Sequence, residues 1–277
     1  MTVAEARQRP VGRLLRGWRV RRRLSQLELA IAADISTRHL SFVETGRAMP
    51  SRDMVLRLAD QLDVPLRERN QLLLAAGYAP VYPRTPLDSP ALDPVRAAVR
   101  RGLAAHEPYP AVALDQGWHL IDTNHGAALL TTGAAEPLLA PPVNMLRLTL
   151  HPAGLAPRIL NLGQWRAQLL GRLRRQVELT GDPELADLYD ELRDYPCDQP
   201  EPELAVPGPG DVLVPLRIRD GERRLSFFST VSTFATPLDV TVAELSVESF
   251  FPLDQATTAA FSPADGPGTP VGTAVVG

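Results

Sequence analysis

Residues 24–47 have the sequence LSQLELAIAADISTRHLSFVETGR, and this stretch decides the fold of the first part of the chain. Ser25 and Glu28 match a capping box, in which each side chain accepts a hydrogen bond from the other residue's backbone amide. A helix is therefore predicted to begin at Gln26. Ser36 is placed to cap a second helix. Two short helices should thus meet across a turn of only a few residues.

Three more helices are predicted around this pair. Residues 11–23 carry apolar side chains at helical spacing with arginines around them, so one face of this helix should be buried. Ser51 can cap a fourth helix, and Pro65 can open a fifth, because proline suits the first turn of a helix. Residues 1–78 are therefore expected to form an all-α domain of five helices.

The charge of the chain is unevenly distributed. The 277 residues are enough for two domains, and the 44% that are hydrophobic can form real cores. All 29 basic residues are arginine, and the formal net charge is −3. Residues 1–78 contain 14 arginines and 8 acidic residues, whereas the rest contains 15 and 24, so the two parts carry +6 and −9. Because phosphates attract clustered cations, the first part is the candidate for binding nucleic acid.

The composition excludes several kinds of site. A Walker A loop, a protein kinase and a pyridoxal phosphate enzyme each need a lysine, and the chain has none. Cys197 is the single cysteine and the five histidines are scattered, so neither disulfides nor a metal site is expected. No nucleophile elbow or zinc-protease motif is present, so we expect no enzyme. No apolar run approaches the ~18 residues of a membrane span, and a cytoplasmic protein without a resident cofactor is expected.

Prolines mark the expected boundaries. Five prolines recur every three or four residues near residues 79–94, which prevents a helix and predicts an extended, semi-stiff linker. Residues 95–261 follow as a second domain, in which a second proline cluster at residues 196–209 is assigned to a long loop. Residues 262–277 are small residues, proline and glycine, and are expected to be a disordered tail.

The second domain mixes both kinds of secondary structure. Short apolar runs on either side of Asp115-Gln116-Gly117, and again of Asp220-Gly221, are typical of β-hairpins. The predicted strands lie within residues 111–123, 212–219, 224–234 and 240–251. The predicted helices cover residues 94–106, 125–130, 162–179 and 183–193, with a last short one after Asp254. Strands at both ends and helices between them predict an α+β, PAS-like domain with an antiparallel sheet and helices to one side.

Residues 24–47, with Pro50 and Ser51, resemble the helix-turn-helix of the phage repressor and Cro class, often called the XRE family. The resemblance covers about the first 78 residues. It departs from the family pattern at Asp34, where glycine is more common in the turn. Aspartate tolerates a left-handed backbone better than most residues, so the turn is still expected.

The resemblance implies that the helix after Ser36 enters the major groove and presents its first turn to base edges. Thr37, Arg38 and, one turn later, Phe42 are the candidates for base contact. Arg38 could bind the O6 and N7 atoms of guanine, and Phe42 could pack on a thymine methyl or instead be an aromatic at the edge of the core. The candidates for phosphate contact are Gln26, Ser36, Arg47 and Arg52.

Three stretches of the second domain, PAVALDQGWHLID (110–122), NMLR (144–147) and DVTVAELSVESFFP (239–252), resemble the ligand-binding domain of MmyB-like transcription regulators. That resemblance implies a PAS-like domain holding a fatty acid or similar lipophilic molecule. The candidates for the cavity wall, each of which could also be plain core, are Trp118, Leu146, Trp165, Leu169, Phe228 and Phe250. If the ligand is a carboxylate, Arg147 is the first choice to bind it and Asn144 and His151 the second, although Arg147 could equally lie on the surface.

These observations predict a sequence-specific transcription regulator that binds double-stranded DNA and responds to a small lipophilic effector. One short recognition helix reads few bases, so a homodimer on a two-fold operator is expected. The alternative is a regulator whose acidic second domain binds a protein partner. A long exposed apolar patch without a cavity would favour this alternative.

Overall fold

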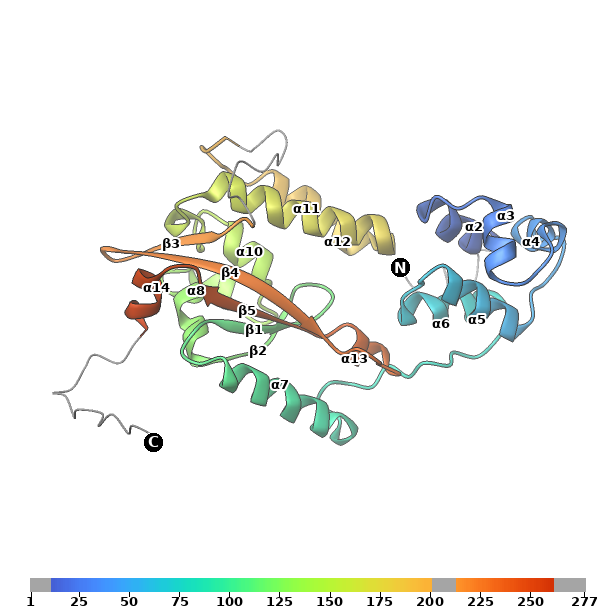
Figure 1. The fold of residues 1–277 in the computed structure, drawn as a ribbon, viewed down its shortest axis with the longest axis horizontal. Helices are drawn as coiled ribbons and strands as arrows, with labels where there is room; N and C mark the ends of the chain where they lie inside the picture. Colours follow the sequence, from blue (N-terminus) through green and yellow to red (C-terminus); the bar gives the residue numbers. More distant parts are fainter. Residues whose placement is uncertain (1–10, 201–212, 262–277) are drawn as a thin grey trace, which may run out of the picture.

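The structure is a computed structural model that describes residues 11–200 and 213–261 (Figure 1). Its first domain is all-α and has the five predicted helices. Their bounds are α2 (Val11–Arg21), α3 (Gln26–Ala32), α4 (Thr37–Glu44), α5 (Arg52–Gln61) and α6 (Leu66–Ala75). Leucines from all five helices form its fully buried core, namely Leu15, Leu29, Leu40, Leu58 and Leu72.

Local side chains fix the helix ends of this domain. The Ser25 hydroxyl accepts from the Glu28 amide at 3.1 Å, and the Glu28 carboxylate accepts from the Ser25 amide at 2.7 Å, which confirms the capping box. Ser36 caps α4 by accepting from the His39 amide at 3.1 Å. Asp34, in the turn between α3 and α4, has a φ of +52°. An aspartate therefore takes the left-handed position that glycine commonly occupies.

The second domain is α+β and contains the predicted antiparallel sheet. Its five strands have the order β2-β1-β5-β4-β3, and all neighbours are antiparallel. The strands are β1 (Ala111–Leu114), β2 (Leu120–Thr123), β3 (Leu216–Asp220), β4 (Arg223–Thr233) and β5 (Ser246–Pro252). Helix α7 covers one face, while α10, α11 and α12 lie over the other and enclose the main core (Figure 1).

The helices of this domain follow the sequence prediction in most places. The longer ones are α7 (Asp93–Ala105), α11 (Leu162–Thr180) and α12 (Pro183–Arg193). The shorter α-helices are α8 (Ala128–Thr131), α9 (Glu136–Leu139), α10 (Met145–Leu150), α13 (Val240–Ala243) and α14 (Gln255–Ala260). The described residues of this domain also form the 3-10 turns η1 (Pro90–Leu92), η2 (His125–Ala127) and η3 (Ala156–Arg158).

The prediction of one strand over residues 240–251 is confirmed in its second half and wrong in its first. The first part of this stretch is the helix α13, and the strand β5 begins only at Ser246. Asp239 explains the difference, because its carboxylate accepts from the Thr241 amide at 2.8 Å and caps a helical turn. The β-branched residues Val240, Thr241 and Val242 therefore form a helical turn despite their preference for strands.

The proline-rich segment after the first domain is bonded to both domains. Asn70 on α6 accepts hydrogen bonds from the amides of Val81 and Tyr82 at 3.0 and 3.1 Å. The Thr85 hydroxyl donates to the Asp239 carboxylate at 2.6 Å, just before α13. The expectation of an extended linker over residues 79–94 is wrong in its last part, because Pro90 and Pro94 lie in the first turns of η1 and α7, where proline is tolerated.

Two other expectations concern residues outside the described part. The predicted tail at residues 262–277 and most of the second proline cluster, residues 201–209, lie outside the described residues.

Among the helices that the structure describes, none combines the length and the apolar character that a membrane span requires. Residues 11–200 and 213–261 likewise contain no group of three acidic, histidine or cysteine side chains arranged to hold a metal ion.

Candidate DNA-binding surface and ligand cavity

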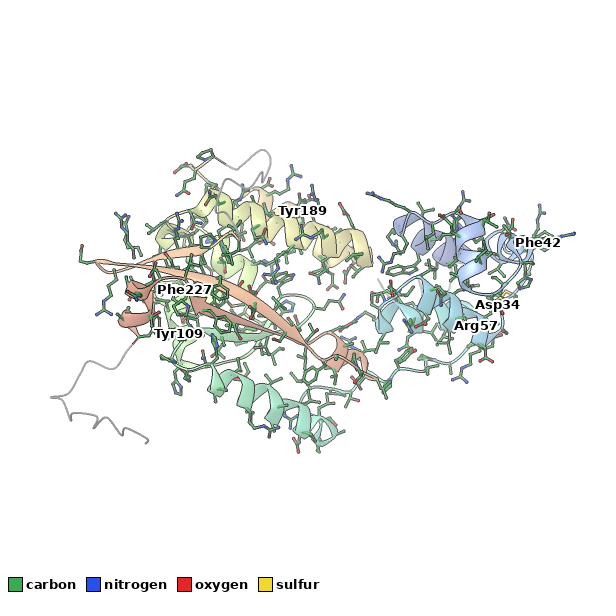
Figure 2. All side chains as sticks on the ribbon, viewed as in Figure 1. Asp34, Phe42, Arg57, Tyr109, Tyr189 and Phe227 are labelled. Atoms are coloured by element: carbon green, nitrogen blue, oxygen red, sulfur yellow. The ribbon has the colours of Figure 1, made fainter. Side chains whose placement is uncertain are left out.

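Helix α4 has one buried face and one face directed to solvent. Leu40 and Val43 are fully buried and fix the helix to α2 and α3. The opposite face carries Arg38, which is exposed, and Phe42, which is half-buried. Figure 2 shows Phe42 at the end of the molecule opposite the sheet. The second domain therefore does not cover the predicted recognition helix.

Two of the three candidates for base contact lie in the first turn of α4, and the third lies one turn later. Thr37 is its first residue, and Arg38 lies one helical turn before Phe42. The guanidinium carbon of Arg38 is 5.4 Å from the centre of the Phe42 ring, which is a cation–π contact. This contact holds the arginine along the solvent-facing side of the helix. Their contact with bases remains a prediction.

A buried ion pair sets the angle of α4. Glu44, 5% exposed, receives hydrogen bonds from Arg19 Nε and Nη2 at 2.7 and 2.8 Å, and from Gln26 Nε2 at 2.7 Å. These three residues come from three helices. Burial alone would raise the pKa of Glu44, but the hydrogen bonds from Arg19 and Gln26 offset it and hold the pKa below its ordinary value. The carboxylate therefore stays charged and ties α2, α3 and α4 together.

The candidates for phosphate contact differ in whether their side chains already have a hydrogen-bond or ion-pair partner. The Gln26 side chain donates to Glu44, so it must leave this bond before it can donate to a phosphate. The Ser36 hydroxyl accepts from an amide and keeps its own hydrogen available for donation. Arg47 and Arg52 are exposed and make no ion pair with any described residue. Arg52 begins α5, where Ser51 caps the helix.

The second domain encloses a small apolar cavity between the sheet and the helices α10 and α11. Five of the six predicted wall residues line it, namely Trp118, Leu146, Trp165, Leu169 and Phe250. The cavity measures about 30 Å³. A space of this size holds roughly two water molecules, so a larger guest has to push the wall residues apart.

Phe228 does not line the cavity, and this prediction is corrected. It stacks on Phe251 with ring centres 5.2 Å apart and an angle of 14° between the planes. Successive residues of a strand point to opposite faces, and Leu225 and Phe227 take the inward positions of β4. Phe228 therefore lies on the outer face of the sheet.

The three candidates for binding a ligand carboxylate also lie outside the cavity. Arg147 donates from Nε and Nη2 to Glu191 at distances of 2.6 to 3.0 Å, and it faces a polar groove near the junction of the domains. Asn144 caps α10 and donates to the Gly117 carbonyl at 2.8 Å. His151 packs its ring edge-on against Tyr195 at 5.1 Å.

Polar residues that the sequence did not single out do reach the cavity. Glu248 on β5 lines it, is 5% exposed, and accepts from Arg172 Nη1 at 3.0 Å. The Arg172 guanidinium also lies 4.8 Å from the centre of the Trp118 ring. Thr149 lines the same space and is 9% exposed. Glu248 could have been found, because it shares the inward face of its strand with Phe250.

The two domains meet where α6 approaches α13. Arg67 on α6 donates from Nε and Nη2 to the two carboxylate oxygens of Glu244, at 2.7 and 2.5 Å. Beside it, Glu68 is 7% exposed and its Oε2 has no hydrogen-bond partner among the described residues. Burial, together with the nearby carboxylates of Glu244 and Asp182, raises the pKa of Glu68 to about 7.

Comparison with known families assigns both domains. A helix-turn-helix domain model matches residues 10–72, and the model of the MmyB-like transcription regulator ligand binding domain matches residues 95–262. Neither model describes an enzyme. No curated protein matches the chain. Because the second model covers more than half of the sequence, the chain belongs to the MmyB-like transcription regulator family and is a DNA-binding regulator with a ligand-binding domain.

Proposed function

We propose that the protein is a homodimeric, sequence-specific transcription regulator whose affinity for its operator depends on a lipophilic molecule bound in the second domain. The exposed face of α4 carries the DNA part of this proposal. Arg38 there has no ion-pair partner among the described residues, while the buried Glu44 fixes the opposite side of the helix. A rigid helix with a free guanidinium suits major-groove contacts to guanine.

The cavity supports a small-molecule effector rather than a protein partner in the second domain. It lies inside the core between two layers, where a protein could not reach it, and its walls are mainly aromatic and aliphatic. Pockets of this kind bind apolar molecules with few polar contacts. Entry of such a molecule has to displace β5 or α11, because the existing space is small.

The strand β5 gives this displacement a route to the DNA-binding domain. Phe250 and Glu248 of β5 line the cavity, and α13 lies directly before this strand. Glu244, between the two, holds Arg67 of α6. A shift of β5 therefore moves the partner of Arg67 and changes how the DNA-binding domain is held. In a dimer, this alters the spacing of the two recognition helices and hence operator affinity.

Two steps test this function. An operator is first selected from random DNA with the full chain, and lipophilic molecules that co-purify with the protein are identified by mass spectrometry. Operator affinity is then measured with and without the identified molecule, in the wild type and in Arg67→Ala. The wild type should respond by about 5-fold or more, and Arg67→Ala should bind the operator but lose most of the response. A chain that enriches no sequence, or that binds the operator equally with and without the molecule, contradicts the proposal.

A further inference from the structure

We propose that two copies of this chain pair through the open edge of β4, so that their two sheets join into one continuous antiparallel sheet. This inference rests on the proposed function, because it names the surface through which the proposed homodimer forms. Its basis is residues 228–233, the part of β4 that extends past β3 (Figure 1). Among the described residues, that part has a strand on one side and none on the other.

The strand β3 is too short to cover β4. It begins at Leu216, which pairs with Phe227, whereas β5 accompanies β4 as far as Thr233. Pro215 stands directly before β3 and has no amide hydrogen to donate, and its carbonyl accepts from Asn161 Nδ2 at 2.8 Å. The chain therefore pairs with β4 only from Leu216 onward, and the rest of β4 has one neighbouring strand in the described part of the chain.

The backbone groups that face this open edge follow from the alternation along the strand. The Ser226 carbonyl accepts from the Leu253 amide at 2.8 Å, just past the end of β5, so the even-numbered residues of β4 point toward β5. The odd-numbered residues point the other way. Beyond β3 these are Ser229, Val231 and Thr233. Their amides and carbonyls have no hydrogen-bond partner among the described residues.

The two outer strands of the sheet differ from this stretch, because neighbouring loops bond to them. At β2, the Leu120 amide donates to the Val143 carbonyl at 2.8 Å. At β3, the Leu160 amide donates to the Arg217 carbonyl at 2.8 Å, and the Arg217 amide donates to Asn161 Oδ1 at 3.1 Å. The open part of β4 has no such cover from residues 11–200 and 213–261.

The side chains along the open edge do not prevent pairing. Residues 228–233 contain neither a charged residue nor a proline. Val231 is 46% exposed, and its neighbours Thr230 and Ser232 are exposed as well. Native edge strands commonly carry charges, prolines or bulges that keep other chains from pairing with them. An edge without these features is suited to a partner strand.

A second copy of β4 fits this edge. When two copies meet antiparallel on a two-fold axis at Val231, Val231 pairs with the partner's Val231 and Ser229 with the partner's Thr233. Each amide at the open edge then finds a carbonyl. Residues 201–212 of the same chain are a poorer partner, because they contain three prolines, which cannot donate to a ladder. The two-fold axis also matches the two-fold operator of the proposed function.

Sedimentation equilibrium of the full chain tests this interface at concentrations from about 1 to 200 µM, because so short a ladder predicts a dissociation constant in the micromolar range. Val231→Pro removes the amide hydrogen at the centre of the ladder. Since this amide points away from β5, each sheet keeps its own hydrogen bonds. The variant should raise the dissociation constant of the dimer at least about 10-fold.

Val231→Thr is the matched control, because it keeps the amide hydrogen and a β-branched side chain. It should dimerise as the wild type does. Circular dichroism verifies that both variants are folded.

A distance measurement tests the interface with the ladder intact. Cys197→Ser removes the single cysteine, and Ser232→Cys places a nitroxide label on an exposed residue beside the two-fold axis. Paired strands lie about 5 Å apart with a rise of about 3.4 Å per residue, so pulsed electron paramagnetic resonance should give a label separation of about 20 Å or less.

The outcomes separate this inference from the proposed function. A dimer whose dissociation constant does not change in Val231→Pro, or whose labels lie far apart, overturns the β4 interface while the homodimer still stands. A wild type that is monomeric at every concentration also overturns this interface, because sheet pairing does not require DNA. The homodimer itself is wrong if a single chain occupies the selected operator.

Discussion

The arginines at the candidate DNA surface and those near the cavity are used in opposite ways. In the DNA-binding domain, Arg38, Arg47 and Arg52 are exposed and make no ion pair with the described residues. In the ligand-binding domain, Arg147 and Arg172 are held by Glu191 and Glu248. Unpaired cations on one face attract phosphates, whereas paired cations are already neutralised by a carboxylate. The comparison teaches that the net charge of a domain is less informative than which of its charges are free.

Three arginines of the first domain, Arg19, Arg67 and Arg69, are paired, and removing the partner of Arg19 should have the largest effect. Glu44→Ala leaves Arg19 without its buried partner and should lower the free energy of unfolding of the DNA-binding domain by about 3 to 5 kcal/mol. Urea unfolding followed by circular dichroism measures this change. Asp60→Ala is the control, because Asp60 is an exposed partner of Arg69 at 3.3 Å and should cost about 1 kcal/mol or less. Equal losses of unfolding free energy in the two variants would show that the buried ion pair between Arg19 and Glu44 does not hold α4 in place.

The second-largest predicted effect concerns Glu68 at the junction between the domains, whose raised pKa makes the free energy of unfolding depend on pH. A carboxyl whose pKa is raised to about 7 in the folded state binds its proton more tightly there than in the unfolded chain. Its contribution is complete below the ordinary value near 4.5 and declines as the pH rises toward 7. Because one pKa unit corresponds to about 1.4 kcal/mol, the decline should be on the order of 3 kcal/mol.

Glu68→Gln isolates this contribution, because the amide has no proton to lose. The variant should become more stable relative to the wild type between pH 5 and 7 in urea unfolding, with a constant difference above that range. Carboxylates with lowered pKa values, such as Glu44 and Glu191, act in the opposite direction below their ordinary pKa. Their contribution cancels in the difference between variant and wild type. A difference that does not change with pH would refute the buried, protonated Glu68.

The free arginines should produce the smallest change for each residue. Arg52→Ala removes the phosphate contact that we propose for this residue and should weaken binding to all DNA by a similar factor, with the salt slope reduced by about 1. Arg101→Ala removes an equally exposed arginine from α7 in the second domain and should leave DNA affinity unchanged. Fluorescence anisotropy at several salt concentrations measures both variants. Loss of operator binding alone in Arg52→Ala would mean that this residue reads bases.

The helix-turn-helix could be predicted because its signals are local. The Ser25 capping box, the Ser36 cap and the left-handed Asp34 all depend on residues a few positions apart. The close packing of α2 on α4 could not be predicted. A Cβ added to Gly12 would lie 2.1 Å from the Val43 carbonyl oxygen, a contact between residues in separate helices.

The cavity was predictable in its wall but not in its polar groups. Five of the six large apolar residues that were predicted to form the wall do line the cavity. The prediction for the sixth, Phe228, was wrong, because the sequence does not say which face of β4 is buried. The pair formed by Arg172 and Glu248 joins residues 76 positions apart. Arg147 seemed the natural anchor because it interrupts an apolar run, but its partner Glu191 lies on a different helix.

The role of α4 in reading DNA is tested most directly by one measurement. The affinity of Arg38→Ala is compared with that of the wild type on the selected operator and on random DNA of the same length. Loss of a bidentate contact to guanine should cost about 1 to 3 kcal/mol on the operator and relax the sequence preference there, with little change on random DNA. Equal losses on the two DNAs would contradict the assignment of α4 as the recognition helix.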